Sequence, residues 1–289
     1  MIKSFSFIAS LVAAVLLLAG CKGDNYEVRG DSVYFTWWTW SFGNQEQLLE
    51  GADAGSFEQV AEWLGKDKNH VWYKARLAEG CDPQTVKALK KGLFCDKKDY
   101  YYEGAALHVA DIATFEVLEF NDYTLWAKDC KCAYYDSIRI DSVDAKTFEV
   151  INSFYARDSR HVFNAAKVLP LADPETFEDL QMLYLKDKNH VWYSDSIIPD
   201  ANAAEFKAQM DYGWDSKNVW YNGKMLKGAD PRSFEVLESG NYAKDAKHVW
   251  YHDELVKGAD AASFKDDGQM EGHDKNQKYV CERIYDLDD

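Results

Sequence analysis

The chain has 289 residues, of which 15% are aromatic and 28% are charged. So large an aromatic fraction is ample for a buried core, which argues against a disordered chain. Asp and Glu outnumber Lys and Arg by 49 to 33, so the formal net charge is −16. An acidic surface repels phosphate backbones, and we therefore expect no binding to nucleic acid.

Residues 1–20 have the pattern of a secretory signal. Lys3 provides a short basic start, and the apolar run Phe5–Leu18 is shorter than the roughly 20 residues of a membrane span. The tetrapeptide Leu-Ala-Gly-Cys at 18–21 resembles the lipobox of bacterial lipoproteins. That resemblance implies cleavage before Cys21 and attachment of diacylglycerol to its sulfur. An ordinary signal peptide followed by an incidental cysteine is the alternative.

Removal of the signal leaves 32 basic and 49 acidic side chains, because Lys3 is its only charged residue, and the charge becomes −17. Such a chain gains no electrostatic attraction to an anionic membrane, so the lipid on Cys21 must provide the anchor. We expect residues 21–30 to form a tether and residues 31–289 a single repeat domain. The expected location is the bacterial cell envelope, at the outer membrane or the cell surface.

The segment Thr36–Asn44, TWWTWSFGN, is an insertion relative to the later repeats. Its tryptophans make it too hydrophobic for an idle loop. They either cover the open end of the repeat array, which terminal repeats require, or bind a ligand. Trp37, Trp38 and Trp40 are therefore the candidate ligand-binding residues.

A repeat of about 29 residues runs through the rest of the chain and decides the fold class. Each copy begins at a turn aspartate, and successive aspartates are 28 to 33 residues apart: Asp67, Asp96, Asp129, Asp158, Asp187, Asp215, Asp245 and Asp274. Five positions later an aromatic residue always follows: Trp72, Tyr101, Tyr134, Phe163, Trp192, Trp220, Trp250 and Tyr279. Each complete copy then has a polar cap residue, Asp or Asn, fifteen positions after the turn aspartate.

One unit is predicted to contain three short antiparallel strands and one capped helical turn. The Asp-Lys-Asn turn separates two strands rich in β-forming residues, such as Asn241–Lys244 and His248–Tyr251. Asn222-Gly223 is a strong hairpin signal that leads to a third strand at Met225-Leu226. In Asp230–Phe234 an Asp is followed by Pro, which is typical of a helix N-terminus.

A unit of this size cannot bury both faces of its aromatic strand, so neighbouring units must stack and share a core. Adjacent strand residues point to opposite faces. The series that begins at Trp72 is expected in the core, whereas the series that begins at Tyr73 either packs or lines an exposed binding stripe. We predict an all-β elongated hairpin array of eight to nine units. A closed propeller-like ring is the alternative, although 29 residues is short for a four-stranded blade.

The turn and its paired aromatics resemble the DKNYY repeat family. The sequence DKNHVWY occurs at Asp67–Tyr73 and at Asp187–Tyr193, and close variants occur at Asp215–Tyr221 and Asp245–Tyr251. The resemblance covers about residues 31–289. It implies a bacterial chain that is exported or lipid-anchored, and it brings no assigned activity and no catalytic residues.

Five cysteines follow Cys21: Cys81, Cys95, Cys130, Cys132 and Cys281. Export permits disulfides, but an odd number leaves at least one thiol unpaired. Cys81 and Cys95 could close a small loop. Cys130 and Cys132 would point to one face of a strand, but no CxxC pair or nearby His supports a zinc site there.

Two repeated series of side chains could also bind metal ions. His70, His161, His190 and His248 share one position of the unit, but two intervening units without His interrupt any ladder. The turn aspartates could bind calcium. Lys follows the aspartate in four copies, however, and would place a cation where the metal should sit. We interpret both series as structural and predict no metal and no cofactor.

No nucleophile–base set, phosphate-binding loop or metalloprotease motif occurs in the sequence, so we predict no enzymatic activity. We expect a lipid-anchored envelope protein that acts as a binding scaffold for a protein or a glycan. A structural spacer of the envelope is the first alternative. An envelope hydrolase is the second, and it would require a polar pocket near Tyr123–Trp126, in the second departure from the repeat.

Overall fold

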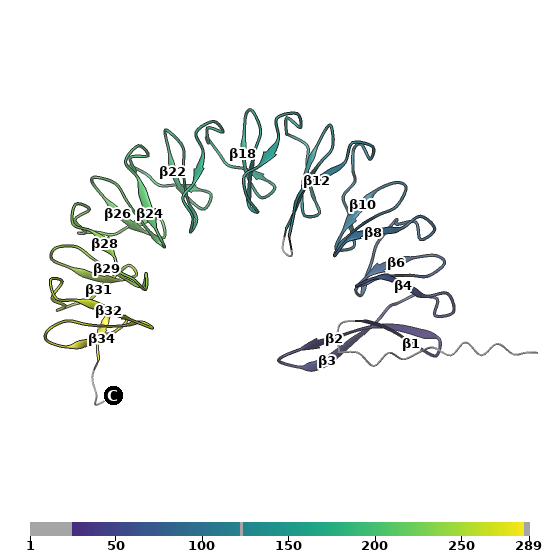
Figure 1. Ribbon diagram of the computed structural model, residues 1–289, viewed down its shortest axis with the longest axis horizontal. Coiled ribbons are helices and arrows are strands. Elements are labelled where there is room, and N and C mark those ends of the chain that lie inside the picture. Colours follow the sequence, from purple (N-terminus) through teal and green to yellow (C-terminus); the bar gives the residue numbers. More distant parts are fainter. Residues whose placement is uncertain (1–24, 122–123, 286–289) are drawn as a thin grey trace, which may run out of the picture. The chain divides into compact units, whose positions relative to one another are not determined.

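The computed structural model describes residues 25–121 and 124–285, and Cys21 and the predicted signal lie outside them. The chain divides into two compact units, the first ending at Leu107 and the second beginning at His108, where we expected one domain. The same kind of antiparallel sheet recurs in both units (Figure 1).

The first unit contains three sheets in the part described, and the strands of each pair in chain order. The first sheet has three strands: β1 (Asn25–Arg29), β2 (Ser32–Thr39) and β3 (Gly43–Leu48). The second consists of β4 (Glu58–Ala61), β5 (Leu64–Lys66), β6 (Val71–Tyr73) and β7 (Arg76–Leu77). The third consists of β8 (Lys87–Lys90), β9 (Leu93–Cys95), β10 (Tyr100–Tyr102) and β11 (Ala105–Ala106).

The second unit contains six four-stranded sheets over its described residues. The first three are β12 (Glu116–Phe120), β13 (Leu125–Lys128), β14 (Ala133–Tyr135) and β15 (Ile138–Ile140); β16 (Glu149–Val150), β17 (Tyr155–Arg157), β18 (Val162–Asn164) and β19 (Lys167–Val168); and β20 (Glu178–Asp179), β21 (Tyr184–Lys186), β22 (Val191–Tyr193) and β23 (Ser196–Ile197). The last three are β24 (Lys207–Gln209), β25 (Tyr212–Trp214), β26 (Val219–Tyr221) and β27 (Lys224–Met225); β28 (Glu235–Val236), β29 (Tyr242–Lys244), β30 (Val249–Tyr251) and β31 (Glu254–Leu255); and β32 (Lys265–Gly268), β33 (Glu271–His273), β34 (Lys278–Val280) and β35 (Arg283–Ile284).

The all-β repeat prediction is confirmed, but the predicted helical turn is wrong. Asp230–Phe234 forms a turn in which Ser233 N–H donates to the Asp230 carbonyl at 3.2 Å. The chain then enters β28, where Val236 pairs with Ala243. A neighbouring strand supplies ladder hydrogen bonds that one isolated helical turn cannot match. Residues 25–121 and 124–285 contain no helix, and hence none that could cross a membrane.

The predicted tether is shorter than expected, because Asn25–Arg29 is strand β1 of the first sheet. Its Tyr26 side chain is buried. No sheet of the described residues combines strands from both ends of the chain or closes into a barrel. The sheet topology is that of consecutive hairpins, as predicted.

Aromatic side chains fill the interface between neighbouring sheets within each unit. Tyr184 of β21 and Trp220 of β26 face one another across the connecting segment, which contributes Phe206. The ring centroid of Phe206 lies 5.5 Å from that of Tyr184 and 5.6 Å from that of Trp220. All residues of the series that begins at Trp72 are buried, which confirms the shared core: Trp72, Tyr101, Tyr134, Phe163, Trp192, Trp220, Trp250 and Tyr279.

Hydrogen bonds from buried aromatic side chains also join several sheets to the next sheet within the same unit. The hydroxyl of Tyr212 donates to the His252 carbonyl at 3.0 Å, and that of Tyr242 donates to the Cys281 carbonyl at 2.8 Å. In the first unit the Tyr26 hydroxyl donates to the Trp63 carbonyl at 2.7 Å. A buried donor that finds a partner only in the adjacent sheet makes the stability of one sheet depend on its neighbour.

Candidate functional site

The turn aspartates, which were candidate calcium ligands, hold the backbone together. Each carboxylate is buried and accepts hydrogen bonds from the N–H groups two and three residues later and from the N–H of the preceding cap residue. This pattern holds for all eight turn aspartates: Asp67, Asp96, Asp129, Asp158, Asp187, Asp215, Asp245 and Asp274. These bonds satisfy the buried charge without a metal ion.

The lysine that follows the turn aspartate neutralises the cap residue instead of leaving it open to a cation. Lys68 Nζ lies 2.8 Å from Asp53 Oδ2, and Lys275 Nζ lies 2.8 Å from Asp260 Oδ2. The hydrogen bond from Lys275 is the largest cause that holds the pKa of Asp260 down, at about 2. Among the described residues, no group of three or more His, Cys, Asp or Glu side chains is arranged to hold a metal ion.

The histidine series does not form a ladder, because each imidazole packs against residues of its own repeat. His190 lies 3.6 Å from the carboxylate of Asp187, and its ring centroid lies 5.4 Å from that of Trp192. His248 is held in the same way by Asp245, at 3.3 Å. The series is structural where the chain is described.

The cysteines give no sign of joint chemistry. Cys81, Cys95, Cys130, Cys132 and Cys281 are all free thiols. Cys130 and Cys132 lie at the Asp129 turn rather than on one strand face: Cys130 Sγ lies 3.3 Å from Asp111 Oδ2, whereas Cys132 Sγ lies 3.3 Å from Asp141 Oδ1. Burial raises the pKa of the Cys81 thiol to about 12, which leaves it protonated and unreactive at neutral pH.

The second aromatic series is packed, and no exposed binding stripe is formed by it. Tyr73, Tyr102, Tyr221 and Tyr251 are buried. Within the second unit, the next sheet along the chain covers Tyr221 with its hairpin turn: the ring centroid of His252 lies 5.3 Å from that of Tyr221, with the rings stacked. Both faces of the aromatic strand are therefore used for stacking.

The described residues of the second departure from the repeat include Trp126 of β13. Trp126 is fully buried, and its indole N–H donates to the Ser153 carbonyl at 3.1 Å. Trp126 thus takes the place that Tyr212 and Tyr242 hold in later sheets. Tyr123 lies outside the described residues.

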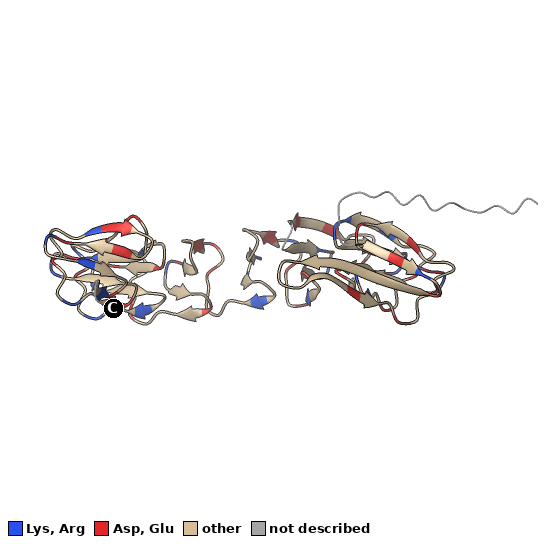
Figure 2. Cartoon of the chain, turned by 90° about the horizontal axis from the view of Figure 1, so that it is seen from below, with Lys and Arg blue, Asp and Glu red and all other residues tan. Residues whose placement is uncertain are grey.

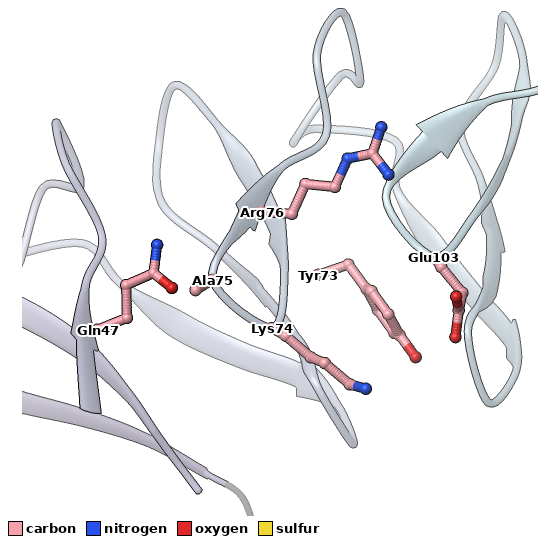
Figure 3. Close-up of a pocket in the computed structure, with 6 residues that line it drawn as sticks. All are labelled: Gln47, Tyr73, Lys74, Ala75, Arg76 and Glu103. Atoms are coloured by element: carbon pink, nitrogen blue, oxygen red, sulfur yellow. The ribbon is translucent and has the colours of Figure 1, made fainter. Parts of the chain in front are cut away.

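An open pocket of about 390 Å³ lies in the first unit, beside the hairpin turn between β6 and β7 (Figure 3). It is lined by Gln47, Tyr73, Lys74, Ala75, Arg76 and Glu103. Burial raises the pKa of the Tyr73 phenol far above neutrality, so this group cannot act as a base there. The ammonium of Lys74 lies 4.2 Å from the ring centroid of Trp63, in a cation–π contact. The pocket therefore contains polar groups but no activated nucleophile.

The three candidate tryptophans lie on one long hairpin, which β2 and β3 form, but they do not share one role. Trp37 pairs with Gln45 and stacks on Phe35 at 5.9 Å, at the border of the first core. Trp38 points to the opposite side of the strand and is 42% exposed, while Trp40 is 94% exposed. Trp37 thus extends the core, whereas Trp38 and Trp40 face solvent.

Phe42 joins the two exposed tryptophans at the end of the hairpin, where it is 80% exposed. We call Trp38, Trp40 and Phe42 the aromatic tip. The rings of Trp38 and Trp40 contact edge to face, with centroids 4.7 Å apart. Phe42 was not among the candidate residues predicted from the sequence, which were all tryptophans, although it belongs to the same insertion.

The turn of this hairpin is held by side chains of its own strands. Phe42 N–H donates to Thr39 Oγ1 at 3.2 Å, and the amide of Gln45 donates to the Phe42 carbonyl at 2.9 Å. Gly43 has a φ of 67°, which lets β3 begin directly after the turn. The exposed rings are therefore carried on a defined backbone.

Comparison with known proteins relates the chain to the DKNYY family. The model of the DKNYY family matches residues 26–167, 76–196 and 167–283, which overlap and together span almost all of the described chain. No curated protein and no solved structure matches the chain. On the repeated turn, the stacked sheets and this match, the chain belongs to the DKNYY family.

Proposed function

We propose that the chain is a lipid-anchored scaffold of the bacterial cell envelope, at the outer membrane or cell surface, held through Cys21. In this proposal it contacts another envelope component through the aromatic tip. Stacking buries the rings of Trp72, Trp192 and Trp220 in the regular sheets, so these rings are not available to a partner.

The observation that carries the proposal is the exposure of Trp40. The chain has ten tryptophans. Five of them, Trp72, Trp126, Trp192, Trp220 and Trp250, are at most 3% exposed, whereas Trp40 is 94% exposed. Exposure of a large aromatic side chain to water is energetically unfavourable, and Trp side chains are typical centres of binding sites.

Binding is favoured over catalysis by the chemistry available. The pocket beside Tyr73 has no activated nucleophile, and the thiol of Cys81 is kept protonated by burial. A hydrolase would need a nucleophile and a base within hydrogen-bond distance. An aromatic tip, in contrast, needs only a partner that covers it.

Photo-crosslinking in the native envelope tests the proposal. A photoreactive residue at Ser41, between Trp40 and Phe42, should give an adduct with a protein, a glycan or a lipid. The same residue at Asp195, in the short hairpin turn of a regular unit, is the matched control and should give none. Substitution of Trp38 and Trp40 by Ser should abolish the Ser41 adduct. Equal adducts at both positions would refute a role for the tip.

The lipid anchor is tested separately. The Cys21→Ser variant should leave the membrane fraction, and mass spectrometry of the unmodified N-terminal peptide should show the added mass of the acyl chains. A Cys21→Ser variant that remained in the membrane fraction with no lipid adduct on the unmodified chain would overturn the assignment.

A spacer is the second candidate, favoured by the near-identity of successive sheets. Removal of residues 187–214 deletes one repeat period. If the chain is a spacer, its function should change with the number of repeats and should tolerate loss of Trp38 and Trp40. For the scaffold that we propose, function should tolerate the deletion and should be lost with Trp38 and Trp40.

A further inference from the structure

We infer that the aromatic tip inserts into the interfacial region of the same bilayer that holds the lipid on Cys21. This inference rests on the proposed function, since it takes the anchor and the tip from it, and it names the envelope component that the tip contacts. Three features of the first sheet support it: where β1 begins, which residues the hairpin lacks, and how its polar groups are satisfied.

Strand β1 begins at the point where the long hairpin leaves the sheet. Asn25 pairs with Thr36, and Thr36 Oγ1 donates to the Asn25 carbonyl at 3.2 Å. Beyond this pair, β2 continues to Thr39 against β3 alone (Figure 1). The chain that arrives from Cys21 therefore enters the sheet at the end from which the tip extends.

The anchor and the tip are within reach of the same membrane surface. A strand rises about 3.3 Å per residue, so Trp40 lies about 13 Å beyond Thr36 along the hairpin. Cys21 lies four positions before Asn25 in the sequence, and four residue steps span at most about 14 Å at full extension. The sulfur of Cys21 can thus reach the level of the tip, and a lipid inserted there brings the bilayer surface to the aromatic rings.

The part of the hairpin that carries the aromatic tip lacks charge in a chain that is otherwise rich in it. Ser32–Gln45 contains no Asp, Glu, Lys or Arg, although 28% of the whole chain is charged. Figure 2 shows acidic and basic residues on the sheets of both units. A charged group is costly to move out of water, whereas Trp favours the membrane–water interface. The composition of this segment fits the interface better than it fits an acidic or basic partner.

Both backbone groups of Phe42 at the tip already have partners, which lowers the cost of removing this residue from water. The Phe42 carbonyl accepts from Gln45, and the Phe42 N–H donates to Thr39. Unpaired backbone groups are costly in an apolar medium. With these bonds in place, insertion of the rings of Trp38, Trp40 and Phe42 leaves the backbone N–H and C=O of Phe42 paired.

Quenching of tryptophan fluorescence by brominated lipid tests insertion directly. The lipidated chain is reconstituted into zwitterionic phosphatidylcholine vesicles with and without brominated acyl chains. We expect quenching of the exposed tryptophans in the unmodified chain, because the buried tryptophans are shielded by protein. Ser41→Asp keeps every tryptophan but places a charge at the tip, and it should reduce the quenched fraction several-fold. Ser194→Asp, at a short hairpin turn of a regular unit, is the matched control and should quench like the unmodified chain.

A second measurement uses the unlipidated Cys21→Ser chain and vesicle sedimentation. The combined substitutions Trp38→Ser, Trp40→Ser and Phe42→Ser should lower the vesicle partition coefficient by at least about tenfold, because most of the buried apolar area is lost. Phe154→Ser removes a ring that is 59% exposed in the second unit and should leave the coefficient unchanged. Added salt should have little effect, since Ser32–Gln45, which includes the aromatic tip, carries no charge.

The outcomes separate this inference from the function on which it rests. Equal fluorescence with brominated and ordinary lipid would overturn insertion. If the Ser41 photo-adduct with a protein or a glycan persisted in that case, the scaffold would stand with a different partner. If that adduct were also absent, both proposals would fail.

Discussion

The first sheet and the sheet formed by β24–β27 have the same framework but different hairpins. In the first sheet Tyr26, Val33, Phe35 and Leu49 form the core face, and in the later sheet Tyr212, Val219, Tyr221 and Leu226 take the same places. The later sheet turns at Asn222-Gly223, whereas the first extends to the aromatic tip. Stacking requires the shared positions only. The added residues of the first hairpin are therefore free for another role.

Acid should produce the largest effect, and it should act on the regular sheets. Burial alone would raise the pKa of Asp245, but hydrogen bonds from the N–H groups of Asp230, Lys247 and His248 outweigh it and hold the pKa below the ordinary value. At Asp158 and Asp274 hydrogen bonds from N–H groups likewise outweigh burial and lower the pKa, and at Asp129 the hydroxyl of Tyr134 contributes together with N–H groups.

A carboxyl group with a lowered pKa binds fewer protons in the folded than in the unfolded chain. Its contribution to stability is complete above the unfolded value, about 3.9, and is lost as the pH falls through the folded value. The urea midpoint should thus stay level near neutrality and fall steeply from about pH 4 towards pH 2. A midpoint that did not change over this range would contradict the structural role of the turn aspartates.

Trp220→Ala should destabilise the chain by about 3–5 kcal/mol, since it removes a buried ring from the interface between two sheets. The ring contacts Phe206, and Tyr184 belongs to the same cluster. Urea unfolding gives the free energy, and hydrogen exchange should show the loss of protection centred on β20–β27. Unchanged protection in these strands would argue against a shared core.

Asp245→Ala should cost about 2–4 kcal/mol, because three backbone N–H groups lose a charged acceptor. Asp253→Ala, at an exposed turn of the same sheet, changes the net charge equally and serves as the control. Similar losses in both variants would show that net charge, and not the hydrogen bonds, determines the effect.

Tyr212→Phe should cost about 1 kcal/mol, since it removes the hydroxyl that donates to the His252 carbonyl and leaves the ring in place. Thermal unfolding of the variant checks the value. A loss as large as that of Trp220→Ala would mean that the ring also moves.

The repeat could be predicted from the sequence because its signals are local and recur at one spacing. The turn at Asp187 and the buried Trp192 are examples. The fourth strand of the sheet could not be predicted from the sequence, because β28 has only two residues and becomes a strand by pairing with β29. The burial of Tyr221 was also open, because adjacent residues of a strand buried on both faces give no alternation.

The candidate site was only partly predictable. The insertion at Thr36–Asn44 stands out by composition, and the residues around Trp40 were identified from it. Strand alternation could have separated Trp37 from Trp38, but it requires knowledge of which face meets the next sheet. Phe42 follows from the length of the hairpin, which depends on the pairing of Thr39 with Gly43.

The denaturation midpoint of the variant with serine at positions 38, 40 and 42 tests most directly whether the aromatic tip is separate from the fold. The exposed rings contribute little to the folded state, so the free energy of unfolding should remain within about 0.5 kcal/mol of the unmodified chain. A loss comparable to that of Trp220→Ala would show instead that the tip is part of the core, and the account of the first sheet would be wrong.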